Sequence, residues 1–257
     1  MRRLRRLLRQ RSLRWAEGVC VLEGPDLIVA ALDADVEVEA LYVDRRALDD
    51  ATVVSLCDRA SSAGVRVFSL DEGVVAKVAT AQHPQPVVAS VHFVVADLAQ
   101  LPTTGLVLVL DNVRDPGNVG TIIRSADAAG TSAVVLTGDC VDPFNPKALR
   151  ASAGSIFHVP LAVTSLEATL SHFARWGVRS YATVPRDAPS FRQADLTRGC
   201  LVVIGNESAG LDEATRARCD AAITIEMVGR SESLNAGVAA SLIAFEALHQ
   251  RRGTTDG

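Results

Sequence analysis

Residues 106–130 read "LVLVLDNVRDPGNVGTIIRSADAAG", an apolar run followed by a glycine-containing turn and a helical pattern. A continuous Val/Leu run is typical of a strand that is covered on both faces in a parallel sheet. The turn lacks the three-glycine spacing of a dinucleotide site and the Gly-Lys-Ser/Thr end of a P-loop. The stretch therefore predicts an α/β fold with a ligand loop after its strand, and it disfavours the ordinary nucleotide-binding folds and a nicotinamide-dependent oxidoreductase.

Apolar runs continue to alternate with helical segments after this stretch. Each further run is a strand candidate, and most are separated by a helical segment, which favours a mostly parallel sheet. A long helix is expected at the end of the chain. The further strand candidates are 132–138, 178–184, 200–205 and 221–227.

A smaller α/β unit is indicated before this stretch, over residues 20–95. Residues 96–105 are the expected linker, because they separate two strand-like runs and contain a proline and a glycine. We therefore expect two α/β domains, at 1–98 and 99–257.

The composition is that of a globular protein outside the membrane. The chain has 257 residues, 48% of them hydrophobic and 22% charged, and its longest apolar stretches fall short of the roughly 20 residues that span a bilayer. Five scattered cysteines form no CxxC pair, and no His/Cys cluster has the spacing of metal ligands. We expect a cytoplasmic protein with no membrane contact and no metal.

Basic residues are concentrated at the N-terminus. The first 14 residues contain no acid, whereas the rest of the chain carries 19 basic and 30 acidic side chains, a net charge of −11. Such a basic segment on an acidic body suggests a polyanionic partner, although a solvated, partly helical tail would give the same pattern. The candidate RNA-binding residues here are Arg2, Arg3, Arg5, Arg6, Arg9, Arg11 and Arg14.

The turn after the 106–110 run places polar side chains at the start of a helix. Asn118 is suited to cap a helix that begins near residue 119. Arg124 would lie in the second turn of that helix, with its guanidinium directed back toward the loop. A functional arginine and a structural ion pair with Asp111 or Asp127 both remain open from spacing alone.

Two later segments have the same character. The segment "VVIGNESAGL", residues 202–211, places Gly205 and Glu207 directly after a buried strand, where α/β proteins commonly bind ligands. The segment "IEMVGRSESLNAGVAASL", residues 225–242, enters the final helix near Ser233, which by itself is suited to be the N-cap of that helix.

Together the three segments resemble the three motifs of the SpoU (TrmH-like) branch of the SPOUT RNA methyltransferases. The first motif, Asn-x-Gly-x-x-x-Arg, matches Asn118, Gly120 and Arg124. The second, Gly-x-Glu-x-x-Gly, matches Gly205, Glu207 and Gly210, and the third ends in Ser233, Leu234 and Asn235. Residues 142–154 are similar to the family's stretch between the first two motifs, with Asn145, Lys147, Arg150 and Ser152 in place.

The resemblance extends to the N-terminal unit. The segments "VLEGPDLIVAAL" (21–32) and "VATAQHPQPVVASV" (78–91) resemble the L30e-like substrate-binding domain that precedes the catalytic domain in one set of these enzymes. Pro86 departs from the family pattern, which usually has a glycine there, and so do Ser208, Ala209 and Glu226. None of these departures removes a residue to which the resemblance assigns chemistry.

The resemblance implies a homodimer with a deep trefoil knot that binds S-adenosyl-L-methionine and methylates a ribose 2′-hydroxyl. The catalytic candidates are then Arg124, Asn118, Glu207, Ser233 and Asn235; the cofactor-binding candidates are Gly205, Ile225, Leu234 and Thr183; and Lys147 and Arg150 join the RNA-binding arginines. Arg124 would either accept the hydroxyl proton after a substrate phosphate strips its own, or stay charged and stabilise the alkoxide.

The expected substrate is structured RNA, with 23S rRNA favoured because the two-domain layout is similar to that of the rRNA-modifying members. A tRNA 2′-O-methyltransferase and a non-catalytic RNA-binding paralogue are the alternatives.

Overall fold

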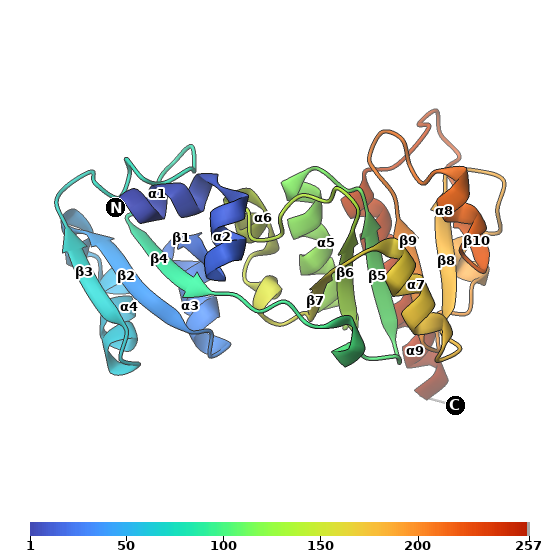
Figure 1. Cartoon of the computed structure of the whole chain (residues 1–257), viewed down its shortest axis with the longest axis horizontal. Coiled ribbons are helices and arrows are strands. Elements are labelled where there is room, and N and C mark those ends of the chain that lie inside the picture. Colours follow the sequence, from blue (N-terminus) through green and yellow to red (C-terminus); the bar gives the residue numbers. More distant parts are fainter. Residues whose placement is uncertain (256–257) are drawn as a thin grey trace. The chain divides into compact units, whose positions relative to one another are not determined.

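The structure is a computed structural model that describes residues 1–255, and its contacts divide the chain into two compact units (Figure 1). Unit 1 contains Met1–Val94 together with Asp142–His158, and unit 2 contains Val95–Val141 and the chain from Val159 onward. The first crossing between the units lies close to the expected boundary after residue 98. The expected division took no account of residues 142–158, which the contacts place with the N-terminal unit.

Unit 1 is built on a four-stranded mixed sheet with the strand order β1-β4-β2-β3. Strand β4 is antiparallel to both β1 and β2, whereas β2 and β3 are parallel. Its strands are β1 (Val19–Glu23), β2 (Val38–Asp44), β3 (Arg66–Leu70) and β4 (Val87–His92), and its helices are α1 (Arg2–Arg9), α2 (Arg11–Glu17), α3 (Pro25–Asp33), α4 (Ala51–Ser62) and α6 (Pro146–Ser152), with 3₁₀ turns at Arg45–Asp49 and Ser155–Phe157.

The arginine-rich N-terminus forms part of the core of unit 1. Leu4, Leu7 and Leu8 repeat at helical spacing in α1, and all three are buried against a cluster that includes Val19 and Val21 of β1. The alternating leucines and arginines therefore give an amphipathic helix, and the alternative of a solvated tail is wrong for the apolar face of this helix.

A buried ion pair holds residues 142–158 in unit 1. Both Arg14 and Asp142 are 3% exposed, and their closest charged atoms, Nη2 and Oδ2, are 2.5 Å apart. The same carboxylate accepts a hydrogen bond of 3.2 Å from Nε1 of Trp15, and the rings of Phe93 and Phe144 stack with centroids 3.8 Å apart. Arg14 is therefore a structural residue here, which corrects its place among the RNA-binding candidates.

Unit 2 is built on a six-stranded sheet with the order β10-β8-β9-β5-β6-β7, in which every neighbouring pair is parallel. The expected parallel sheet is confirmed. Its strands are β5 (Leu106–Asp111), β6 (Ala133–Thr137), β7 (Leu161–Val163), β8 (Arg179–Val184), β9 (Cys200–Ile204) and β10 (Ala221–Thr224), and its helices are α5 (Pro116–Ala128), α7 (Leu166–Ala174), α8 (Glu213–Ala217) and α9 (Ala236–Thr255), with 3₁₀ turns at Leu98–Gln100 and Phe191–Gln193.

The core of unit 2 follows from the continuous apolar runs. Strands β5, β6 and β9 lie in the middle of the sheet and are buried along their whole length, because helices cover both faces of a parallel sheet. Strand β7 was not predicted, since its three residues are too few to give a pattern of their own. None of the described helices is long and apolar enough to cross a membrane.

Candidate active site

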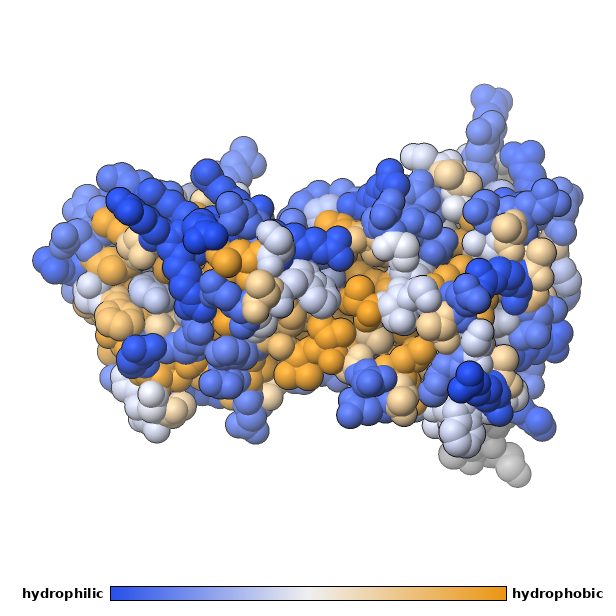
Figure 2. Space-filling view, in the orientation of Figure 1, coloured by the Kyte–Doolittle hydropathy of each residue, from blue (hydrophilic) through white to orange (hydrophobic). Residues whose placement is uncertain are grey.

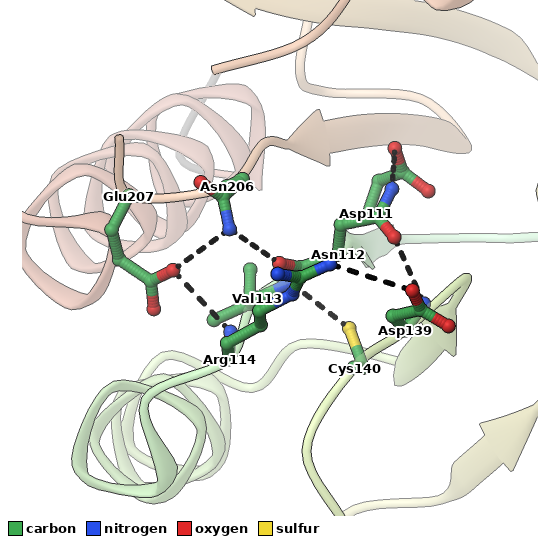
Figure 3. Close-up of polar contacts among 8 residues, drawn as sticks. All are labelled: Asp111, Asn112, Val113, Arg114, Asp139, Cys140, Asn206 and Glu207. Atoms are coloured by element: carbon green, nitrogen blue, oxygen red, sulfur yellow. Dashed lines mark hydrogen bonds and ion pairs between the residues drawn. The ribbon is translucent and has the colours of Figure 1, made fainter. Parts of the chain in front are cut away.

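The three sequence segments meet in unit 2 beyond the carboxyl ends of β5 and β9, next to the start of α9. Loops at this edge of a parallel sheet are a common ligand position. In Figure 3 the loop after β5 and the loop after β9 face each other, with Glu207 directed toward Arg114. Asn206 joins the two loops, because its side chain donates a hydrogen bond of 2.8 Å to the carbonyl oxygen of Asn112.

The carboxylate of Glu207 holds the loop that leads into α5. One oxygen accepts from the backbone N–H of Asp115 at 3.1 Å and from Nδ2 of Asn118 at 2.9 Å. The other accepts from the backbone N–H of Arg114 at 3.3 Å. Burial acts to raise the pKa of Glu207, but the hydrogen bonds from Asn118, its own backbone and the loop outweigh it and hold the pKa below its usual value. Glu207 is therefore an ionised acceptor rather than a general acid.

A chain of side-chain amides continues from Glu207 to α9. Oδ1 of Asn118 accepts from Nδ2 of Asn235 at 2.8 Å, and Oδ1 of Asn235 accepts from the backbone N–H groups of Gly237 at 2.8 Å and Val238 at 3.2 Å. The carboxylate at one end of the chain can only accept, and the helix N–H groups at the other end can only donate. Each side-chain amide therefore has one orientation of its oxygen and nitrogen that satisfies both neighbours. The network therefore fixes the geometry of all three motifs.

Two helix caps differ from the sequence-based expectation. Helix α5 begins at Pro116 and is capped by Asp115, whose side chain accepts from the N–H of Asn118; Asn118 lies in the first turn and is free to bond Glu207. Helix α9 is capped by Asn235 rather than by Ser233. In both cases several residues with capping side chains are adjacent, and sequence alone does not rank them.

Arg124 has no structural partner. Its side chain is exposed, and it has no ion pair or hydrogen bond with any residue between 1 and 255. Asp111, one of the two partners considered, instead accepts from Oγ1 of Thr137 at 2.7 Å and from Nδ2 of Asn112 at 3.0 Å. The structural ion pair that spacing left open is therefore absent from this part of the chain, and the guanidinium is available for a ligand.

A cavity of about 290 Å³ lies next to the Glu207 loop, close to the lower end of the roughly 300–1,000 Å³ that is typical of ligand pockets. All four predicted cofactor-binding residues line it: Thr183, Gly205, Ile225 and Leu234. Glu207 and Ser233 line it too, although no side-chain hydrogen bond of Ser233 is present in the described chain. The pocket thus brings the cofactor candidates together with two of the catalytic ones.

Gly205 has a steric reason to be glycine. A Cβ there would lie 2.5 Å from the carbonyl carbon of Gly210 and 2.6 Å from the nitrogen of Leu211. No larger residue fits without moving the loop that forms one wall of the pocket. The side-chain hydroxyl of Thr183 donates to the carbonyl of Val203 at 2.8 Å, so this side chain shapes the wall rather than offering a free donor.

A second set of contacts, which was not predicted from the sequence, supports the loop after β5. Asn112 adopts a left-handed backbone with φ of 58°, and its Oδ1 accepts from the N–H of Asp139 at 2.9 Å. The thiol of Cys140 accepts from the N–H of Val113 (Figure 3). It also donates to the carbonyl of Leu110. The repeated Asn in "DNVRDPGN" was the available signal, because Asn tolerates this conformation better than most residues.

The RNA-binding candidates lie in unit 1 and differ in availability. Arg2, Arg5 and Arg9 are exposed on α1, whereas Arg3 is paired with Glu17 and Glu39. Arg150 forms an ion pair of 2.9 Å with Glu23. The remaining candidates, Arg6, Arg11 and Lys147, are exposed and belong to local interactions. Arg14 is buried and unavailable for RNA.

No group of His, Cys, Asp or Glu side chains in residues 1–255 could hold a metal ion.

Comparison with known families gives matches to both parts of the chain. Residues 105–245 match the SpoU rRNA Methylase family, and residues 1–89 match the MRM3-like substrate binding domain. The chain belongs to the SpoU rRNA Methylase family. Its SpoU region contains all three segments joined by Glu207, Asn118 and Asn235, and the resemblance seen in the sequence is confirmed.

Similar proteins cover nearly the whole chain. A curated SpoU relative, the 23S rRNA (guanosine(2553)-2′-O)-methyltransferase RlmP of Bacillus subtilis, is 32% identical over 88% of this chain and 86% of its own. The SpoU methyltransferase AviRb of Streptomyces viridochromogenes, solved with AdoMet, is 30% identical with a TM-score of 0.86, covering 98% of both chains. The AdoMet-bound rRNA methyltransferase of Sinorhizobium meliloti is also 30% identical, with a TM-score of 0.85, over 96% of this chain and 93% of its own.

A Glu207→Gln variant tests whether the Glu207 carboxylate supports the loop that leads into α5. Glutamine keeps the size of the side chain but replaces one acceptor oxygen by an NH₂ group, which cannot accept from the loop N–H groups, so we expect a loss of about 1 kcal/mol in the free energy of unfolding at pH 7. Because the folded-state pKa is lowered, the stabilisation is present above the unfolded pKa of about 4.3 and is lost as the pH falls through the folded value.

Thermal unfolding of both proteins from pH 7 to pH 3 measures this difference. The gap in melting temperature should be largest near neutral pH and should close in acid. A gap that stays constant over the whole range would show that the ionised carboxylate does not support the loop.

Proposed function

We propose that this protein transfers a methyl group from S-adenosyl-L-methionine to a ribose 2′-hydroxyl of 23S rRNA. The observation that carries the proposal is the Glu207–Asn118–Asn235 network, which joins the three family segments beside a pocket of ligand size. The similarity to RlmP over most of both chains favours 23S rRNA over tRNA as the substrate. A cytoplasmic location is part of the same proposal.

The pocket fits S-adenosylmethionine through its backbone and apolar walls. Gly205, Ile225 and Leu234 would hold the cofactor, with Thr183 shaping the wall behind it. When bound, the cofactor supplies a methyl group on a sulfonium, which is a good leaving group. The chain's own residues then have to place the ribose hydroxyl in line and stabilise the charge that develops on its oxygen.

Arg124 would act on that oxygen and on the adjoining phosphate. A guanidinium presents a planar fork of donors that matches a phosphate, so Arg124 would clamp the phosphate and stabilise the developing alkoxide. Asn118 and Asn235 would position the substrate side of the site, held by Glu207, and Ser233 would contribute a hydroxyl at the pocket wall.

The N-terminal part would supply RNA affinity. We propose the functional division at 1–98 and 99–257, with Asp142–His158 belonging to the catalytic sequence while packing in unit 1. Exposed Arg2, Arg5 and Arg9 would contact phosphates, and Lys147 would add a further cation. Arg3 and Arg150 are weaker candidates for RNA binding, because their charges are neutralised by Glu39 and Glu23.

The topology and assembly implied by the family are also proposals. We propose a deep trefoil knot in the C-terminal part of unit 2 and a homodimer formed through α9. Val238, Leu242 and Phe245 are 47%, 42% and 48% exposed, and they repeat at helical spacing along α9. An exposed apolar stripe of this kind favours burial against a second copy.

Charging this stripe should separate the protomers. A Leu242→Arg/Phe245→Arg double variant is expected to run as a monomer in size-exclusion chromatography with light scattering, because two charges would be buried without partners. Val54→Arg on α4, where the valine is 39% exposed, is the matched control and should leave the mass unchanged. A double variant that keeps the mass of a dimer would exclude this face as the interface.

Mapping 2′-O-methylation in ribosomal and transfer RNA from cells with and without the gene tests the proposed function. The expected result is one ribose methyl group that disappears from 23S rRNA and is restored by the purified protein with S-adenosylmethionine. Loss of a tRNA methyl group instead would make tRNA the substrate. Failure to bind S-adenosylmethionine in calorimetry would favour the non-catalytic alternative.

A further inference from the structure

The sheet of unit 1 carries a stacked aromatic pair, with one ring exposed, that no part of the methyl-transfer site uses. Tyr42 of β2 and Phe68 of β3 are register partners, and their rings stack with centroids 5.4 Å apart and planes at 18°. Phe68 is 42% exposed although it is a large apolar residue. Strand β3 is the last strand of its sheet, so Phe68 has a neighbouring strand on one side only.

The two rings have different surroundings. Tyr42 packs against the apolar cluster formed by the leucines of α1 and the valines of β1, which fixes its ring. Phe68 stacks on this supported ring. In Figure 2, hydrophobic surface is open to view in the part of the molecule where Figure 1 draws β2 and β3. The pair is thus a rigid aromatic surface rather than a mobile exposed side chain.

An exposed arginine lies on the same strand face as Phe68. Arg66 lies two residues before Phe68 on β3, so the two side chains share a face of the sheet, and Arg66 is exposed with no ion pair in residues 1–255. The nearest acids along the chain, Asp71 and Glu72, are paired with Arg45 and Arg46. The exposed arginines of α1 lie on the helix that packs over this same face of the sheet.

We propose that Phe68, supported by Tyr42, stacks on one unpaired base of the RNA and that Arg66 holds a phosphate of the same strand. An exposed aromatic ring on a sheet, with an arginine on the same face, is suited to single-stranded RNA, because every base has a π-face and every nucleotide a phosphate. A paired base inside a helix has no free face, so the site selects an unpaired nucleotide. This inference rests on the proposed RNA substrate.

Binding of a fluorescein-labelled single-stranded RNA of about 12 nucleotides, compared with a duplex of the same length, tests the stacking. Phe68→Leu keeps an apolar side chain against Tyr42 but removes the π-face, and it should weaken single-strand binding about tenfold while leaving duplex binding unchanged. Phe68→Trp should retain the affinity, and RNA should quench its added indole emission. Val54→Ala, which truncates another exposed apolar residue of unit 1, is the control.

Arg66→Gln should lower the slope of log affinity against log salt concentration by about one counterion.

Unchanged single-strand affinity of Phe68→Leu, or an equal loss of affinity for the duplex, would overturn the stacking site. In methyl transfer to ribosomal RNA, Phe68→Leu should raise KM and leave kcat unchanged. If the wild-type protein binds RNA through Phe68 but methylates no RNA, the proposed function is wrong and the stacking site is retained. If the wild-type protein methylates RNA and Phe68→Leu has the wild-type KM and affinity, the stacking site is wrong and the proposed function is retained.

Discussion

An Arg124→Ala variant is expected to lose methyl transfer by about a thousandfold while it binds S-adenosylmethionine almost as tightly as the wild-type protein. Removing one group that stabilises a developing oxyanion costs a hundredfold to a thousandfold in rate, and Arg124 would contact the neighbouring phosphate as well. Arg124 does not line the cofactor pocket, which is why the cofactor affinity should be retained.

The fold should tolerate the Arg124 substitution, because the side chain is exposed and has no partner in the part of the chain that the structure describes. Radiolabelled methyl transfer to ribosomal RNA measures the rate, and calorimetry measures the cofactor affinity. Arg175→Ala, another exposed arginine of unit 2, is the matched control. Arg124→Lys keeps the charge without the planar fork and should recover part of the rate. Undiminished turnover of Arg124→Ala would remove Arg124 from the mechanism.

Local patterns were sufficient to predict most elements of the fold. Runs rich in apolar residues predicted β5, β6, β8, β9 and β10. The pattern is clearest in β5, β6 and β9, because residues in a strand that is buried on both faces meet apolar neighbours on each side. Strand β7 is too short to give such a pattern. The parallel arrangement followed from the helical segments between the strands.

The site was predicted in part. Spacing and the family resemblance selected Glu207, Asn118 and Asn235, but they did not show that these three side chains form one hydrogen-bonded chain. The sequence did not distinguish a functional role for Arg124 from a structural ion pair, because residue spacing does not show where the side chains of Asp111 and Asp127 point. The structure shows that Asp111 is bonded to Thr137 and Asn112 instead.

The position of residues 142–158 could not be predicted. Arg14 and Asp142 are separated by 128 residues, and no periodicity extends over such a distance. The arginine also belongs to a run of similar residues, and a charge count treats all of them alike. Only the three-dimensional packing distinguishes a buried structural arginine from its exposed neighbours.

An Asp142→Asn variant is expected to destabilise unit 1 by about 3 kcal/mol, because it leaves the charge of Arg14 buried without a counter-ion. The substitution is close to isosteric, and its remaining oxygen can still accept from Nε1 of Trp15 and from the N–H of Phe144, as Oδ1 does now. The loss is therefore confined to the ion pair, in which Nε of Arg14 donates to Oδ2 at 2.7 Å. A loss of this size lowers the melting temperature on the order of 10 °C.

Thermal unfolding of the full chain in a Trp176→Phe background, which leaves Trp15 of unit 1 as the remaining tryptophan, measures the effect of Asp142→Asn by fluorescence. Asp139→Asn is the matched control, because Asp139 is 84% exposed in its pair with Arg114, and such surface pairs contribute little. An Arg14→Met/Asp142→Leu double variant removes both charges and should recover much of the loss, since apolar residues can replace a buried ion pair at little cost. Equal melting temperatures for Asp142→Asn and Asp139→Asn would show that the buried pair does not hold residues 142–158 in place.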